Sequence, residues 1–198
     1  IEAVKVALVK DGGFFAWIES RIEDLAALDH AALEQCVERS ALLHARHIAQ
    51  GGDPFETGSS RPLDFGHWAA HKLEQLSGFT VSHAHAVAIG VALDTLYSAR
   101  CGLLRECEAE RVLEVIAGLK LPLWHDALDV RDETGRRLVH LGLEEFREHL
   151  GGELTVLLLR DAGTGQDVHA LDEGLVDACL DQLRERHGVQ RRALESRP

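Results

Sequence analysis

Residues 64–90 read DFGHWAAHKLEQLSGFTVSHAHAVAIG and are unusually rich in histidine. Four of the chain's twelve histidines lie here: His67, His71, His83 and His85. Apolar residues recur at helical spacing on both sides of the short connection GFTVS, which predicts two consecutive helices. Helices joined this tightly are antiparallel neighbours, so we expect His67 to face His83. The stretch therefore predicts a packed helix pair with imidazoles gathered at its junction.

The spacing of His67 and His71 admits two interpretations. Four residues apart on a helix, the two side chains lie on one face, with Cβ atoms about 5–6 Å apart. Such a pair can share a metal, or one imidazole can bind metal while the other transfers protons. The same spacing also fits two polar positions on a solvated helix face. Gly66 lacks side-chain bulk and suits the close approach of another helix or of a ligand. Catalytic zinc sites use three ligands from histidine and carboxylate, so a third ligand is needed.

The rest of the sequence predicts one mainly helical domain over residues 1–198. Helical segments end at glycines or begin at capping residues, as at Asp29, Ser82 and Asp172. The remaining predicted elements are a helix pair within 4–25, helices over 30–50, 64–76, 104–119 and 173–188, a loop over 51–62, and a β-hairpin near residues 153–171. Residues 188–198 are expected to form a flexible tail.

Composition narrows the class of protein. The formal net charge of −12 argues against a nucleic-acid partner, because such proteins present a basic surface. No apolar run approaches the roughly 20 residues that span a bilayer, and no signal peptide is recognisable. The four cysteines lack CxxC spacing, which predicts buried free thiols and a cytoplasmic location.

Three motifs resemble those of 3-dehydroquinate synthases and occur in the same order. IEAVK resembles the family's EVIK segment, DFGHWAAHKLE is similar to NFGHTxGHAIE, and SHAHAVAIG resembles HGEAVAIG. KDGGFFAWIE, GDPFETG and LTVLLL add to the likeness. Together the motifs are far more specific than any one alone. The chain is identified as a member of the sugar-phosphate cyclase superfamily, in the form of its helical C-terminal domain.

The resemblance implies roles for five residues. Glu2, His67 and His83 match the zinc ligands, and one carboxylate with two imidazoles makes a sensible open zinc site. Lys5 and His71 match catalytic residues that contact the substrate, with His71 beside the metal where it can relay protons. Simpler alternatives stay open: Glu2 and Lys5 as a surface ion pair, and His71 as a structural residue.

The match also departs from the family pattern at several positions. The residues that it places in substrate binding are Arg46, Arg61, Asp64 and Arg147. Asp64 puts negative charge where the family carries asparagine, and His85 replaces an acid in the first turn of a helix. Arg46 stands for a lysine, Arg61 lies one position late, and Arg147 lies in a late segment that is lysine-rich in the family. These changes favour a related sugar phosphate or a lost reaction, and the chain resembles a bacterial paralogue group with a DFGHWxAHKLE-type motif.

The function implied by the resemblance is that of a carbon–oxygen lyase dependent on zinc, or another divalent metal, and on NAD. It would eliminate phosphate from a phosphorylated sugar acid and close the ring. No GxGxxG follows a strand here, so NAD is expected to bind mainly to an N-terminal domain absent from this chain. The start at Ile1 and the absence of methionine also predict a piece of a longer protein, inactive alone. A homodimer stays open.

Two other functions remain. A zinc-dependent phosphohydrolase would use the same histidine helix with no NAD. A degenerate, non-catalytic paralogue would keep the fold as a scaffold and bind no stoichiometric zinc.

Overall fold

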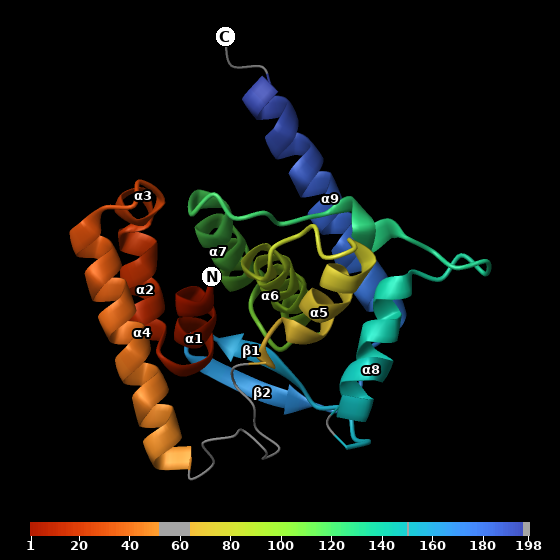
Figure 1. Ribbon diagram of the computed structural model, residues 1–198, viewed down its shortest axis with the longest axis horizontal. Helices are drawn as coiled ribbons and strands as arrows, with labels where there is room; N and C mark the ends of the chain where they lie inside the picture. The colour runs from red at the N-terminus through yellow and green to blue at the C-terminus, as the bar shows by residue number, and fades with distance from the viewer. Residues whose placement is uncertain (52–63, 150, 196–198) are drawn as a thin grey trace.

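The computed structural model describes residues 1–51, 64–149 and 151–195, and it is mainly helical (Figure 1). The α-helices are α1 (Glu2–Lys10), α2 (Gly12–Ser20), α3 (Ile22–Ala26), α4 (His30–Gly51), α5 (His67–Leu76), α6 (His83–Arg100), α7 (Glu106–Gly118), α8 (Leu141–His149) and α9 (Glu173–Glu195). Two 3-10 helices, η2 (Asp126–Asp129) and η3 (Leu138–His140), lie between α7 and α8. The strands are β1 (Val156–Asp161) and β2 (Thr164–Val168).

Helix α6 is the centre of the domain (Figure 1). Every residue from Ala86 to Ser98 is buried, and most of them are apolar. A helix that is apolar on all sides must be covered on all sides, and α6 packs against α5, α7, α9 and β1. Its buried residues include the small side chains of Ala86, Ala88 and Ala92 and the glycine Gly90. Helices α2 and α4 lie together beside α1, and α8 lies on the far side of α5 (Figure 1).

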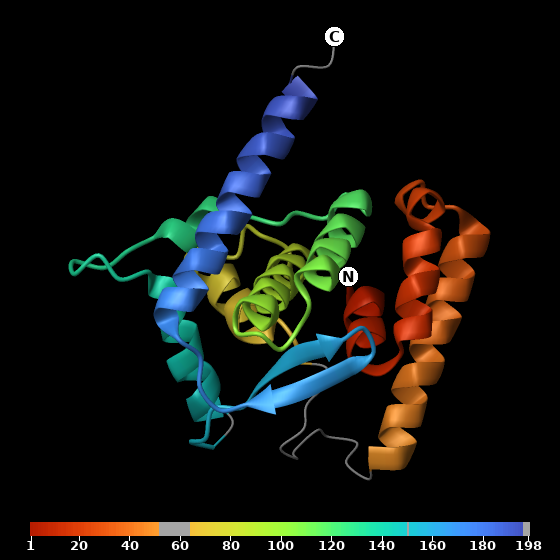
Figure 2. The same cartoon turned by 180° about the vertical axis from the view of Figure 1, so that it is seen from behind.

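The β-hairpin supports the first helix. β1 and β2 pair antiparallel, and Leu158 and Leu159 of β1 are buried against the core. At the hairpin tip, the backbone N–H of Gly163 donates to the carbonyl of Leu8 at 2.7 Å. A Cβ on Gly12 would lie 2.4 Å from the carbonyl oxygen of Ala162, so only glycine fits there. The hairpin tip therefore holds the end of α1 in place (Figure 2).

The predicted fold class and the predicted hairpin are confirmed. The three expected capping residues also form their bonds: Asp29 accepts from the N–H of Ala32, Ser82 from that of His85, and Asp172 from that of Leu175. These caps satisfy N–H groups that have no partner within the helix. No helix among the described residues has both the length and the apolarity to cross a bilayer.

Three expectations need comment. Most of the predicted loop, residues 52–62, lies outside the described residues. The segment expected to be a tail continues as α9 through Glu195, since QRRALE favours a helix, and residues 196–198 are not described. All four cysteines are free thiols, but Cys101 and Cys107 are exposed, contrary to the expectation of burial. They lie near the ends of α6 and α7, where the helix surfaces meet solvent.

Candidate metal centre

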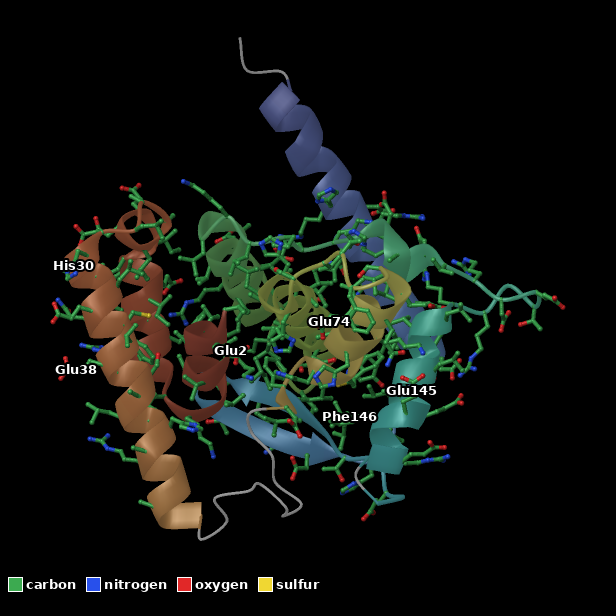
Figure 3. The ribbon with its side chains drawn as sticks, viewed as in Figure 1. Glu2, His30, Glu38, Glu74, Glu145 and Phe146 are labelled. Carbon is green, nitrogen blue, oxygen red and sulfur yellow. The ribbon has the colours of Figure 1, made fainter. Side chains whose placement is uncertain are left out.

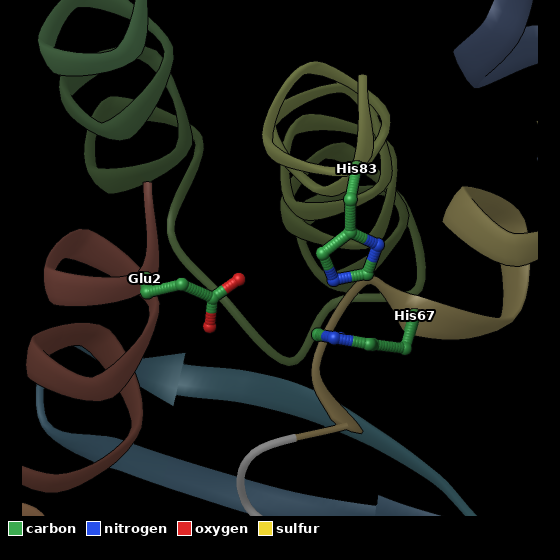
Figure 4. A group of neighbouring side chains, drawn as sticks. All are labelled: Glu2, His67 and His83. Atoms are coloured by element: carbon green, nitrogen blue, oxygen red, sulfur yellow. The ribbon is translucent and has the colours of Figure 1, made fainter. Parts of the chain in front are cut away.

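Glu2, His67 and His83 converge from three helices. One ligand atom from each lies within 4.8 Å of the others. Figure 4 shows the carboxylate of α1 and the imidazoles of α5 and α6 pointing toward one gap. The rings of His67 and His83 have centroids 5.5 Å apart, so the predicted facing of these two residues is confirmed. The three donors form the open carboxylate–imidazole set that suits a zinc ion.

A contact between two glycines sets the distance between α5 and α6. Gly66 has φ +79°, the left-handed conformation that favours glycine, and it directly precedes His67. A Cβ on Gly90 would lie 2.0 Å from the carbonyl oxygen of Gly66. No side chain fits between these segments, so the turn before α5 rests on the backbone of α6. From the sequence, we expected either another helix or a ligand to approach Gly66 closely. The structure shows that a helix, α6, does so.

His67 is held as a neutral ligand. Its Nδ1 lies 3.3 Å from the carbonyl oxygen of Phe65, which accepts the ring N–H and leaves the lone pair on Nε2. Burial and the nearby charge of Lys5 lower the pKa of His67 to about 4. Neutral imidazole is the form that binds metal, so this side chain is prepared for coordination at neutral pH.

His83 is oriented by a carboxylate that the sequence reasoning missed. Its Nδ1 lies 3.2 Å from Oε2 of Glu74, a residue of α5. With its N–H on Nδ1, His83 presents the Nε2 lone pair to Glu2 and His67. Histidines that bind metals commonly donate their other N–H to a carboxylate in this way. Glu74 follows His71 by three residues on the same helix face, a spacing visible in the sequence.

His71 lies beside the candidate ligand group and belongs to a second group of possible ligands. Its ring centroid is 5.4 Å from that of His67, and its side chain is exposed. His71, Glu74 and His83 also bring one ligand atom each within 4.8 Å of one another. A neutral imidazole offers a single lone pair, so His83 cannot serve both groups at once in that form. The bond to Glu74 favours the group with Glu2 and His67, and it leaves His71 at the edge of the open side.

Lys5 pairs with Glu2 on α1. Lys5 Nζ lies 2.7 Å from Oε2 of Glu2, and its side chain is only 4% exposed. The ion pair considered from the sequence is therefore present, and it joins a buried lysine to a glutamate whose side chain is 58% exposed. Burial alone raises the pKa of Glu2, but the hydrogen bond and charge of Lys5 outweigh it, and the pKa is lowered. Glu2 is thus held as the anion that a metal would bind.

The residues expected to bind substrate are more scattered. Asp64 lies half-buried in the turn just before α5, two residues from Gly66. Arg46 is exposed on α4, and Arg61 lies outside the described residues. Arg147 follows Glu145 and Phe146 on α8, which lies far across the view from Glu2 (Figure 3). Asp64 is thus close to His67 along the chain, and Arg46 and Arg147 are exposed on helices that pack against α1 and α5. The substrate contacts of all three residues stay predictions.

A groove of about 480 Å³ between α1 and α4 adjoins the centre. Glu2 and Lys5 line one wall, and Cys36, Ser40 and His44 line the other, along one face of α4. Sequence reasoning missed His44, although the four-residue spacing of these three residues on a helix was visible. The groove adds an imidazole on the side of Lys5 away from His67.

The structure thus shows a helical domain in which one carboxylate and two imidazoles form a candidate metal site. Residues 1–138 match the family model described as 3-dehydroquinate synthase C-terminal, and the chain belongs to this family. The chain is 31% identical to the 3-dehydroquinate synthase of Methylococcus capsulatus, over 91% of this chain and 48% of that protein. It is 32% identical to that of Azotobacter vinelandii, over 93% of this chain and 50% of that protein.

A solved structure agrees with this family. The 2-epi-5-epi-valiolone synthase ValA of Streptomyces hygroscopicus subsp. jinggangensis, with NAD⁺ and Zn²⁺ bound, is 27% identical and superposes with a TM-score of 0.79. The match covers 93% of this chain and 50% of that one. The chain thus spans about half the length of the relatives that it matches.

Proposed function

We propose that this chain is the metal- and substrate-binding domain of a sugar-phosphate cyclase that uses zinc and NAD. The observation that carries the proposal is the convergence of Glu2, His67 and His83, with each imidazole oriented by a hydrogen bond at Nδ1. The family membership and the zinc- and NAD-bound ValA structure support the same reaction class. An N-terminal NAD-binding domain would complete the protein, because the relatives are about twice as long.

In this proposal, some residues bind the metal and the substrate, and another transfers protons. Zinc bound at the three ligands would polarise a substrate oxygen, and NAD would accept and return a hydride. Lys5 keeps Glu2 ionised, and its ammonium group lies at the wall of the α1–α4 groove, where it can bind a substrate anion. His71 presents an exposed imidazole beside His67, in position to move a proton to or from the substrate.

The family resemblance supports a proposal for the substrate class. We propose a heptulosonate 7-phosphate or a related heptulose phosphate as substrate. Asp64 and His85 replace residues that are neutral and acidic in the family motif, which favours a substrate other than that of the main branch. Arg46, Arg61 and Arg147 remain proposed substrate contacts.

The test is an assay of the natural full-length protein with zinc. Phosphate release and carbocycle formation are followed for 3-deoxy-arabino-heptulosonate 7-phosphate and for other heptulose phosphates, with and without NAD. NAD-dependent phosphate release with carbocycle formation supports the proposal. Phosphate release without NAD would instead indicate a phosphohydrolase. Failure to bind stoichiometric zinc would indicate a non-catalytic scaffold.

A further inference from the structure

Asp94, which is outside the candidate ligand group, carries a buried carboxylate that bonds to both residues flanking His67. Asp94 is on α6, and only 1% of its surface is exposed. Its neighbours along the helix, from Ala86 to Ser98, are all buried as well. Burial raises the pKa of Asp94 to about 7, against the effect of its two hydrogen bonds. A buried carboxylate is costly, so its retention at this position needs a reason.

The two hydrogen bonds of Asp94 lie on either side of His67. Its Oδ2 accepts from the backbone N–H of Gly66 at 3.0 Å. Its Oδ1 accepts from Nε1 of Trp68 at 2.8 Å. Both donors are neutral, and both belong to the turn that begins α5. One carboxylate therefore binds the residues immediately before and after His67, a candidate metal ligand.

The same turn determines where the His67 ring points. The ring Nδ1 bonds to the carbonyl of Phe65, one residue before the glycine that Asp94 binds. Gly66 has a left-handed conformation and rests on the backbone of Gly90. The orientation of the ring therefore depends on the conformation of this turn. The hydrogen bonds of Asp94 connect this turn to α6, the helix that also carries His83. The positions of both imidazoles therefore depend on the same helix.

From these contacts we infer that Asp94 is a positioning residue, acting through Gly66 and Trp68 to aim His67 at the metal site. The inference rests on the metal site of the proposed function. It goes beyond that function, because neither Asp94 nor Trp68 belongs to the group of candidate ligands. A purely structural role would change the stability of the domain but not the coordination of a metal.

The test compares four variants by zinc affinity, by the visible absorption of bound Co²⁺, and by the melting temperature without metal. Asp94→Ala removes both bonds, Trp68→Phe removes one while keeping an aromatic side chain, and Asp94→Asn can accept one bond. Thr95→Val is the matched control, because Thr95 is adjacent and buried and its hydroxyl has no hydrogen-bond partner. We expect zinc binding about 10–100-fold weaker in Asp94→Ala and about 10-fold weaker in Trp68→Phe, with altered Co²⁺ bands in both. Asp94→Asn should recover part of the affinity, and Thr95→Val should match the unmodified protein.

The outcomes separate this inference from the proposed function. If the unmodified protein binds stoichiometric zinc, and a folded Asp94→Ala has the same zinc affinity and Co²⁺ spectrum, the inference is overturned and the proposed function stands. If Asp94→Ala does not fold, Trp68→Phe decides by the same two measurements. If the unmodified protein binds no zinc, both the metal site and the inference fail.

Discussion

Nδ1 of His83 lies 3.2 Å from Oε2 of Glu74, so a carboxylate on α5 decides which nitrogen of an α6 histidine faces the candidate metal centre. This bond joins the two helices of the opening motif at their ends. It also explains why one histidine can belong to two groups of potential ligands and still favour one of them.

Glu74→Ala should weaken zinc binding about 10–100-fold without abolishing it, because His83 loses the partner that fixes its ring. Isothermal titration with zinc measures the change. Glu114→Ala, which removes an exposed carboxylate of α7, should leave the affinity unaltered. An unchanged affinity in Glu74→Ala would show that the ring is oriented without it.

Loss of a candidate metal ligand should weaken zinc binding more than loss of Glu74, which only orients a ligand. We expect Glu2→Ala and His67→Ala each to lose stoichiometric zinc in elemental analysis of protein purified and dialysed in the same way. His85→Ala is the control, since that exposed imidazole lies in the same histidine stretch but in neither ligand group. Full zinc occupancy in both ligand variants would place the metal elsewhere.

Gly90→Ala should destabilise the domain by about 2–3 kcal/mol, because its Cβ would lie 2.0 Å from the carbonyl oxygen of Gly66. The steric effect outweighs the higher helix propensity of alanine, about 1 kcal/mol. Urea unfolding measures the difference. Gly174→Ala serves as the control, since the new methyl group would meet only the side-chain oxygen of Asp172, at 3.2 Å. Equal stability of the two variants would contradict the tight contact.

The pH dependence of the metal-free protein should carry a contribution from His67. Its pKa is about 4 in the folded state, below the ordinary value of 6.5. The unfolded chain therefore binds more protons between these values, and the free energy of unfolding falls as the pH drops from about 6.5 to about 4. In His67→Gln this fall should be smaller, by on the order of 2 kcal/mol. Denaturant unfolding at pH 7, 5.5 and 4 checks it, and identical profiles would exclude the effect.

Substitution of Arg137 should lower the stability of the domain much more than substitution of its neighbour Arg136. The Arg137 side chain is 1% exposed and pairs with Asp129, Asp177 and Asp181, which joins η2 to α9. Arg137→Met leaves three partly buried carboxylates without their shared cation, and we expect a loss of about 2–4 kcal/mol. Arg136→Met breaks only exposed pairs with Glu144 and Glu173 and should cost about 1 kcal/mol or less. Thermal unfolding of both variants makes the comparison.

The sequence by itself determined the features that depend on near neighbours. Capping by Asp29, Ser82 and Asp172, the hairpin, and the facing of His67 and His83 across a short connection all follow from local geometry. Such features can be read from the sequence because the interacting groups are a few residues apart or are joined by a tight turn.

Only the tertiary structure decided which distant residues complete the centre. Glu2 reaches the two imidazoles because the hairpin tip and α4 hold α1 against the domain, and motif resemblance alone had pointed to it. Asp94 was not singled out from the sequence, and its bonds to Gly66 and Trp68 became visible only in the structure. Contacts between residues far apart in the chain depend on how whole helices pack, and this packing is set by the summed fit of many side chains. Arg46 and Arg147 are both exposed, and their substrate contacts stay a prediction.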